Sequence, residues 1–151
     1  MNTHAPIFEI LTVSADQVYP LRARLLLDGD EIASRLSGDL GADTLHLGIR
    51  RGEQLVGVAS VCREDCPDLS RDGWRLRGMA IDEALRGFGF GRVLVRLCAE
   101  HARGRGGRTL WCTARETAKG FYEGLGFTSD PRVLSLPTKP DVQFYRMWMD
   151  I

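Results

Sequence analysis

The chain has 151 residues, of which 44% are hydrophobic and 26% are charged, and this size and composition are typical of one soluble globular domain. Twenty basic side chains balance twenty acidic ones, which argues against a surface built to coat nucleic acid. No apolar run approaches the ~20 residues that cross a bilayer, and residues 1–10 lack the pattern of a signal peptide. We therefore expect residues 1–151 to form a single cytoplasmic domain that binds neither nucleic acid nor a membrane.

The four cysteines, Cys62, Cys66, Cys98 and Cys112, are too sparse for a disulfide-stabilised scaffold, so we expect free thiols. A structural zinc site would need a second pair of ligands at a suitable distance from Cys62 and Cys66. The sequence contains no such pair, and we expect no metal site.

The predicted elements of the first half are mainly strands. The runs with strand-type patterns are residues 8–13, 44–50, 54–61 and 74–81. A short turn containing Gly52 joins the second run to the third, which indicates a hairpin. Ser14 is placed as the N-cap of a helix over residues 15–27, and residues 31–40 have a second, weaker helical pattern.

In the second half, strands and helices alternate. Residues 92–103 form an amphipathic helix pattern, followed by a strand over 109–113 and a helix over 115–124. A strand begins at Phe127, and residues 142–149 form the closing strand. The order β-α-α-β-β-β-α-β-α-β-β predicts an α/β fold with a mixed sheet and helices on both faces.

A glycine-rich segment separates the fourth predicted strand from the amphipathic helix. Gly87, Gly89 and Gly91 let the backbone approach a bulky group closely, and the helix that follows presents unpaired N–H groups and the positive end of its dipole. Arg86 and Arg92 add positive charge at both edges, and guanidinium groups suit phosphate oxygens. The segment is therefore a candidate site for a pyrophosphate.

The spacing of these glycines differs from that of two common phosphate-binding loops. A P-loop would need a lysine and a hydroxyl residue after its last glycine, and both are missing here. The dinucleotide-binding pattern Gly-x-Gly-x-x-Gly differs from Gly87-x-Gly89-x-Gly91, which also lies beyond the middle of the chain. A flexible turn before a helix, without any ligand, stays open from the pattern alone.

The segment over residues 76–92 resembles the coenzyme A-binding segment of the GNAT superfamily of N-acetyltransferases. The family motif Arg/Gln-x-x-Gly-x-Gly/Ala is filled by Arg86, Gly89 and Gly91. Further along the chain, residues 118–127 are similar to the family's Ala-x-x-x-Tyr-x-x-x-Gly-Phe helix, and the two motifs stand in the family's order. The resemblance implies a GNAT-like fold whose central, mostly antiparallel sheet has splayed strands.

The resemblance also implies acetyl-CoA as the co-substrate. The strand before the loop would hold its pantetheine, and the loop N–H groups would hold its pyrophosphate. The cofactor-binding residues so implied are Met79, Ala80, Ile81, Arg86, Gly87, Phe88, Gly89, Phe90, Gly91, Arg92, Arg115, Ala118 and Phe121. Arg115 departs from the family, because many relatives have asparagine there, and we expect it to meet a cofactor phosphate instead.

Tyr122 is the candidate catalytic residue, because it matches the family's tyrosine near the cofactor sulfur. A phenol with a pKa near ~10 can protonate a departing thiolate while it stays neutral at pH 7. Aromatic packing beside Phe121 and Phe127 would also account for a tyrosine at this position.

The general base is not identified from the sequence. Many relatives have a glutamate on the strand before the loop, but that strand carries Arg75 and Arg77 here. Asp82 and Glu83 follow the strand and are candidates to act through water, although they suit a solvated turn equally well.

Arg22 and Arg24 are the candidate acceptor-binding residues. They lie on the first predicted helix, which in this fold borders the acceptor pocket, and an arginine there is suited to bind a substrate carboxylate. A solvated helix face accounts for the pair equally well.

The predicted function is transfer of an acetyl group from acetyl-CoA to the primary amine of a small molecule or peptide. Direct attack by the amine is favoured over a cysteine acyl-enzyme, because no Cys–His pair is evident near the loop. A non-catalytic module that binds acyl-CoA on the same fold is the alternative, and a nucleotide-binding protein is the third option. The acceptor is not predicted, and a homodimer is left open.

Overall fold

The computed structural model describes residues 7–69, 72–137 and 139–151. Within these residues, seven strands form one sheet in the order β1-β2-β3-β4-β5-β7-β6. The strands are β1 (Phe8–Thr12), β2 (Leu45–Arg51), β3 (Gln54–Arg63), β4 (Gly73–Ile81), β5 (Thr109–Arg115), β6 (Thr128–Leu136) and β7 (Lys139–Asp150). The pair β4–β5 is parallel, and the other neighbouring strands pair antiparallel.

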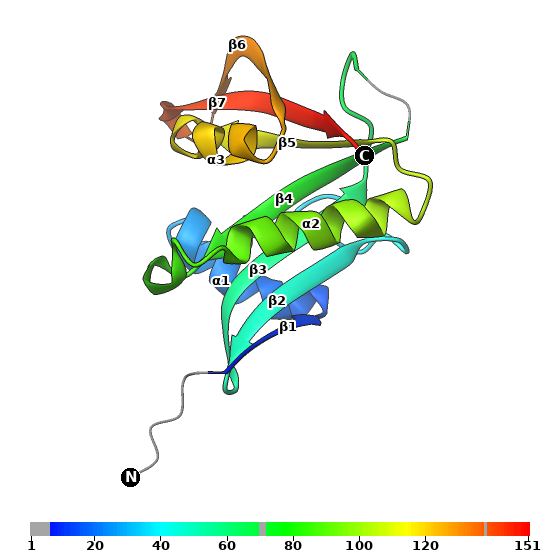
Figure 1. Cartoon of the computed structure of the whole chain (residues 1–151). Coiled ribbons are helices and arrows are strands. Elements are labelled where there is room, and N and C mark those ends of the chain that lie inside the picture. The colour runs from blue at the N-terminus through cyan, green and yellow to red at the C-terminus, as the bar shows by residue number, and fades with distance from the viewer. Residues whose placement is uncertain (1–6, 70–71, 138) are drawn as a thin grey trace.

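Helices cover both faces of the sheet, as the sequence predicts (Figure 1). They are α1 (Ala15–Leu26), α2 (Phe90–Arg103) and α3 (Lys119–Gly124), with short 3-10 helices η1 (Glu83–Leu85) and η2 (Glu116–Ala118). None of the helices in the described ranges is long and apolar enough to cross a membrane.

Two hydrophobic clusters hold these layers together. The larger one lies between the sheet and α2, and it includes Trp74, Leu94 and Leu110, each of which is fully buried. The smaller one lies under α1, where Val18 packs near Val58 of β3. Burying such side chains is the main favourable term in folding, so both faces of the sheet are stabilised by packing.

The second predicted helix, over residues 31–40, is wrong, because this segment consists of turns. Side chains in the segment bond to nearby backbone instead: Asp30 accepts from the Ala33 N–H at 3.0 Å, and Asp39 accepts from the Leu36 N–H at 2.8 Å. Local bonds of this kind compete with a helix. Gly38, at φ +87°, also adopts a left-handed conformation that interrupts helical backbone.

The parallel strands β4 and β5 pair over a short stretch only. Their register joins Gly73 to Thr109, Trp74 to Leu110 and Arg75 to Trp111, and it ends there. Beyond this point the two strands diverge toward α3 and the N-terminal end of α2 (Figure 1). The backbone of β4 after Arg75 therefore has no strand partner on the β5 side, which is the splay that the sequence resemblance implied.

A bulge at Gly78 changes the direction of β4 in the same region. The register with β3 shifts between Val58, opposite Ala80, and Ser60, opposite Arg77, and Gly78 has φ +64°. A bulge adds one residue to a strand and bends it. Before the bulge Leu76 faces the α2 cluster, whereas after it Ala80 faces the α1 cluster.

A fully buried arginine on α1 packs against this bulge. Arg22 donates from Nη1 and Nη2 to the two carboxylate oxygens of Asp39, at 2.8 and 3.0 Å. The same nitrogens donate to the Ser34 carbonyl and to Ser60 Oγ, each at 2.8 Å. The guanidinium also lies against Gly78, where a Cβ would be 3.0 Å from its Cζ. One side chain thus ties α1, the 31–40 segment, β3 and β4 together.

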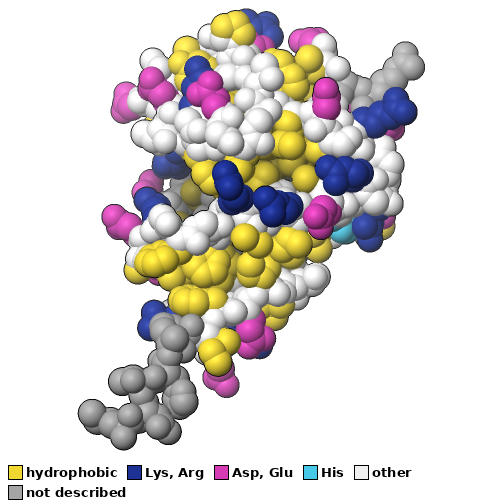
Figure 2. All heavy atoms as spheres, viewed as in Figure 1, with side chains coloured by type: hydrophobic (Ala, Val, Ile, Leu, Met, Phe, Trp, Pro, Cys, Tyr) yellow, Lys and Arg dark blue, Asp and Glu magenta, His cyan; other side chains and the backbone are white. Residues whose placement is uncertain are grey.

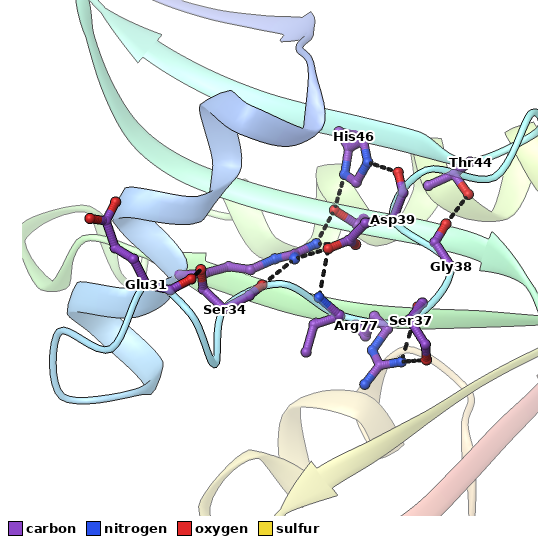
Figure 3. Close-up of polar contacts among 11 residues, drawn as sticks. Glu31, Ser34, Ser37, Gly38, Asp39, Thr44, His46 and Arg77 are labelled. Atoms are coloured by element: carbon purple, nitrogen blue, oxygen red, sulfur yellow. Dashed lines mark hydrogen bonds and ion pairs between the residues drawn. The ribbon is translucent and has the colours of Figure 1, made fainter.

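His46 completes the buried network (Figure 3). Its Nε2 lies 2.8 Å from the Asp39 carbonyl oxygen, and its Nδ1 lies 2.6 Å from Ser60 Oγ. Because a carbonyl only accepts, Nε2 carries the proton, and Ser60 Oγ bridges the ring to Arg22, from which it accepts. A buried ion pair is stable only when its remaining groups are bonded, and this network meets that condition around Asp39.

Replacing Gly78 with alanine tests how strongly the bulge depends on the arginine. We expect Gly78→Ala to lower the free energy of unfolding by about 3 kcal/mol, because it strains the backbone and displaces the Arg22 guanidinium. Urea denaturation measures the loss.

Gly52→Ala is the matched control, since Gly52 has φ +61° but no atom within 4 Å of the added Cβ. Backbone strain alone predicts a loss of about 1–2 kcal/mol there. Equal losses in the two variants would show that crowding against Arg22 contributes nothing.

Candidate functional site

The glycine loop runs from the end of β4 to the start of α2. Asp82 accepts from the Ala84 N–H at 3.1 Å and begins η1, and the buried Leu85 anchors that turn. Gly87 and Gly89 then adopt φ +88° and +86°, a region that other residues rarely occupy. These two glycines let the chain reverse into α2 within a few residues.

The N-terminal end of α2 has no capping side chain and is positively charged. Gly89 is the N-cap and contributes no capping side chain, and the first turn holds no acidic residue. The N–H groups at the start of a helix have no partner inside it, and the helix dipole adds partial positive charge there. Arg86 and Arg92 are exposed beside this end, so the loop is built to receive an anion.

A cavity of about 480 Å³ lies against this loop and the diverging part of β4. Its predicted lining residues are Met79, Ala80, Ile81, Arg86, Gly87, Gly89, Phe90, Gly91, Arg92, Ala118 and Phe121. Figure 2 shows the same side of the molecule as Figure 1, with basic side chains lying beside exposed apolar ones across its middle. The cavity therefore combines an anion-binding end with an apolar wall.

Three leucines that were not predicted as site residues also line this cavity, namely Leu25, Leu26 and Leu85. Leu25 and Leu26 come from the C-terminal turn of α1, and the sequence placed them only within the first predicted helix. Their position at the cavity depends on how α1 crosses the sheet, which no local pattern encodes.

Gly91 is required for packing rather than for a turn. A Cβ at Gly91 would lie 3.1 and 3.3 Å from two atoms of the Phe121 ring, so the glycine lets α3 approach the first turn of α2. The two sequence motifs, one in α2 and one in α3, thus meet at this contact.

Two of the expected cofactor residues lie outside this cavity. Phe88 is 75% exposed at the tip of the loop and is not part of the cavity wall. Arg115 lies at the end of β5 and donates from Nη2 to the Leu26 carbonyl at 3.3 Å. It lines a neighbouring cavity of about 330 Å³, so the structure places it away from the glycine loop and not where a loop-bound phosphate would meet it.

Tyr122 lies in the wall of that second cavity, in the splay between β4 and β5. It is buried, and its ring makes edge contacts with Phe121 and Phe127 at centroid distances of 5.0 and 5.2 Å. Burial raises the pKa of its phenol above the usual value of 10.0. Tyr122 is therefore both a packed aromatic residue and a neutral hydroxyl donor beside a cavity.

The cysteine nearest this site is not suited to nucleophilic attack. Cys112 lines the cavity with Tyr122, but burial raises the pKa of its thiol to about 12. The thiolate is the reactive form, so almost none is present near neutral pH. Cys98, on α2, has its pKa raised to about 12 by the same cause.

A third cavity, of about 440 Å³, lies on the opposite face of the sheet from α2. Its wall includes four charged residues that the sequence analysis did not assign to the site: Glu64, Arg75, Arg77 and Arg146. The signal available in the sequence was the pair of arginines at alternate positions of one strand. Glu64 directly follows β3 and Arg146 lies on β7, so only the tertiary structure brings them to that pair.

The predicted acceptor role of Arg22 is wrong. Its guanidinium is fully buried, and both terminal nitrogens are occupied by Asp39, Ser34 and Ser60, so no substrate carboxylate can reach them. Arg24 is exposed and lies 3.7 Å from the Asp82 carboxylate. Residues two apart on a helix face different directions, and the pair does not form a common site.

The three cavities adjoin one another across the splay. The first and second share Met79 and Ala118 in their walls, and the second and third share Arg77, Gly78 and Thr113. The three cavities are therefore neighbours, and the one that Tyr122 lines adjoins both the glycine-loop cavity and the arginine-lined cavity on the other face.

Comparison with known proteins agrees with this geometry. The chain is 32% identical over 124 residues to the uncharacterized N-acetyltransferase YitI of Bacillus subtilis (strain 168), covering 80% of this chain and 83% of that protein. Aminoglycoside 6'-N-acetyltransferase complexed with coenzyme A has the same fold, with a TM-score of 0.74 at 17% identity over 94% of this chain and 96% of that one. The IAA acetyltransferase of Bacillus cereus ATCC 14579 also has this fold, with a TM-score of 0.71 at 18% identity over 96% of this chain and 100% of that one.

The family model for acetyltransferases of the GNAT type matches residues 9–127, a range that holds the glycine loop, the splay and Tyr122. Together with the relative from Bacillus subtilis, this match establishes that the chain belongs to the Acetyltransferase (GNAT) family.

Proposed function

We propose that the protein transfers an acetyl group from acetyl-CoA directly to a primary amine of a small molecule or peptide. The observation that carries the proposal is the shared walls of the three cavities at the splay, which place an anion-binding loop next to a second cavity whose wall holds Tyr122. A thioester bound at the splay would have its coenzyme A portion on the glycine-loop side. An amine would approach it from the other face of the sheet.

The cofactor would bind mainly through the backbone. The unpaired N–H groups at the start of α2 would hold its pyrophosphate, with Arg86 and Arg92 beside it. The unpaired edge of β4 at Met79–Ile81 would bind the amides of the pantetheine, as a strand partner does. The coenzyme A complex of a structural neighbour is consistent with this use of the fold.

Tyr122 would serve the leaving group. As the amine attacks the thioester carbon, the C–S bond breaks and the sulfur gains negative charge, which a phenol hydroxyl can neutralise by donating its proton. A cysteine acyl-enzyme is not favoured, because the Cys112 thiol has its pKa raised to about 12. Asp82 already caps η1, so we assign the proton of the attacking amine to solvent.

Removing the Tyr122 hydroxyl tests its role. We expect Tyr122→Phe to lower kcat by about 100-fold, the scale of general acid catalysis, while the affinity for acetyl-CoA stays the same. Steady-state kinetics and calorimetry with CoA measure the two effects.

Unchanged turnover would remove Tyr122 from the mechanism. If the wild-type protein binds CoA but acetylates no amine, the non-catalytic acyl-CoA-binding module becomes the better description.

The pH profile supplies an independent test of the same hydroxyl. An acid must be protonated to act, and burial raises the pKa of Tyr122 above 10.0, so the active form persists throughout the neutral and moderately alkaline range. We expect kcat to show no decline between pH 8 and roughly 10. A basic limb that is centred below this range in the wild type, and absent from Tyr122→Phe, would contradict this assignment.

A pair of glycine variants tests the loop. Gly89→Ala forces a side chain into φ +86° at the N-cap of α2, which should turn the N–H groups away from the pyrophosphate and weaken CoA binding by about 10-fold or more, since each lost charge-assisted bond costs about 1.5–3 kcal/mol. Calorimetric titration with CoA measures the affinity.

Gly106→Ala is its control, because Gly106 has φ +81° and open space around it, beyond the other end of α2. It should lose similar stability with no change in affinity for CoA. If both variants bind CoA like the wild type, the loop does not hold the cofactor.

A further inference from the structure

Besides the buried Arg22, three arginines line the cavity on the side of the sheet opposite α2. Trp74 and Leu76 point into the α2 cluster, so Arg75 and Arg77, at the alternate positions of β4, point to the other face. Arg146 of β7 lies on that face as well, since it lines the same cavity. Two strands that are not neighbours in the sheet therefore place guanidinium groups around one space.

One of these arginines is already paired. Arg75 donates from Nη1 to Glu64 Oε2 at 2.9 Å, and its Cζ lies 4.6 Å from the centroid of the Trp111 ring. The ion pair and the ring hold this guanidinium in place at the end of the cavity nearer to Glu64. Arg75 is thus held in the cavity wall, and the Glu64 carboxylate balances its charge.

The other two arginines lack an acidic partner. Arg77 donates to Ser37 at 3.3–3.4 Å (Figure 3), and Arg146 donates to the Pro67 carbonyl at 3.5 Å, all of which are long for hydrogen bonds. Within the described part of the chain, neither side chain forms an ion pair. The Nε atoms of both are inaccessible to solvent and have no partner there.

The electrostatic balance of the cavity is therefore positive. Three guanidinium groups meet one carboxylate, because the charge of Arg22 is matched by Asp39. Burial and the nearby charge of Arg75 lower the pKa of Arg77, against an opposing effect of Glu64, which is consistent with this excess of positive charge. Partly buried like charges are unfavourable unless an anion lies between them, so the cavity suits an anionic occupant.

This cavity lies next to the splay, where we propose that acetyl transfer takes place. Arg77 directly precedes the bulge at Gly78. Both residues line this cavity and also the neighbouring cavity that Tyr122 lines. A molecule whose anionic group meets Arg77 and Arg146 would extend toward the splay with its other end. Leu134 and Phe144 supply an apolar wall along the way.

We propose that the acceptor is an amine that also carries an oxyanion, and that Arg77 and Arg146 bind this oxyanion while the amine reaches the thioester. A carboxylate, as in an amino acid, and a phosphate share this chemistry. The proposal rests on the proposed acetyl transfer and names the class of its acceptor. The carboxylate-binding role that we expected of Arg22 is thereby assigned to Arg77 and Arg146, whose side chains line the cavity.

Matched acceptors test the charge requirement. Each pair differs only in the anionic group: β-alanine against ethylamine, γ-aminobutyrate against propylamine, and O-phosphoethanolamine against ethanolamine. We expect kcat/KM to be at least about 10-fold higher for the anionic member of a pair, the effect of one charge-assisted contact. The carboxylate and phosphate pairs also show which oxyanion is preferred.

Arginine variants test the residues. Arg77→Gln and Arg146→Gln should each raise KM for the anionic acceptor by about 10-fold and reduce the preference over its neutral partner, with KM for acetyl-CoA unchanged. Arg63→Gln is the control, since Arg63 lies on the same sheet, outside the cavity, paired with Asp43 at 3.0 Å. Thermal melting of each variant checks that it is folded.

A binding measurement makes the outcome independent of turnover. The protein saturated with CoA is titrated with glutarate and with its neutral diamide, so that the cofactor site is occupied throughout. Glutarate should bind more tightly than the diamide, and the double variant Arg77→Gln/Arg146→Gln should remove the difference.

Equal binding of glutarate and diamide, or equal kcat/KM within every acceptor pair, would overturn the anionic acceptor while leaving acetyl transfer intact. Failure of the protein to bind CoA would instead overturn the proposed function itself.

Discussion

The structure depends on the contact between the buried Arg22 guanidinium and the bulge at Gly78. A buried charge is tolerated only when it is paired, and Asp39 and Ser60, from the 31–40 segment and β3, accept from both terminal nitrogens of Arg22. Only a glycine leaves room for the guanidinium at this point of β4. The contact fixes α1 on the sheet where β4 turns away from β5, next to the three cavities that adjoin one another there.

The splay separates two kinds of positive charge. On one side, backbone N–H groups and the exposed Arg86 and Arg92 form a cationic end at α2, suited to a flexible phosphate chain. On the other side, the partly buried Arg77 and Arg146 point into a confined space. Between them lies Tyr122, whose neutral hydroxyl has its pKa raised by burial. A thioester bridging the two sides would bring its reactive carbon to that hydroxyl.

Features encoded by neighbouring residues could be predicted from the sequence. The glycine spacing indicated the anion site, and alternation and periodicity located the sheet and the three helices to within a few residues. The 31–40 segment was mispredicted, because Asp39 is held by Arg22 from another element and not by a helix of its own. Arg115 lines the second cavity and not the glycine-loop cavity, and the carbonyl that it bonds, at Leu26, is supplied by α1, which no local pattern indicates.

The sequence by itself determined the family, and it located the loop and the tyrosine that we propose as the cofactor site and the acid, since both motifs are short and continuous. Only the tertiary structure decided which arginines are structural and which are available. The sequence does not distinguish Arg22 from Arg77, yet the terminal nitrogens of Arg22 are occupied by acceptors from two segments, whereas Arg77 has no acidic partner among the described residues. That difference arises because the partners of a buried charge come from residues distant in the chain, which no local pattern records.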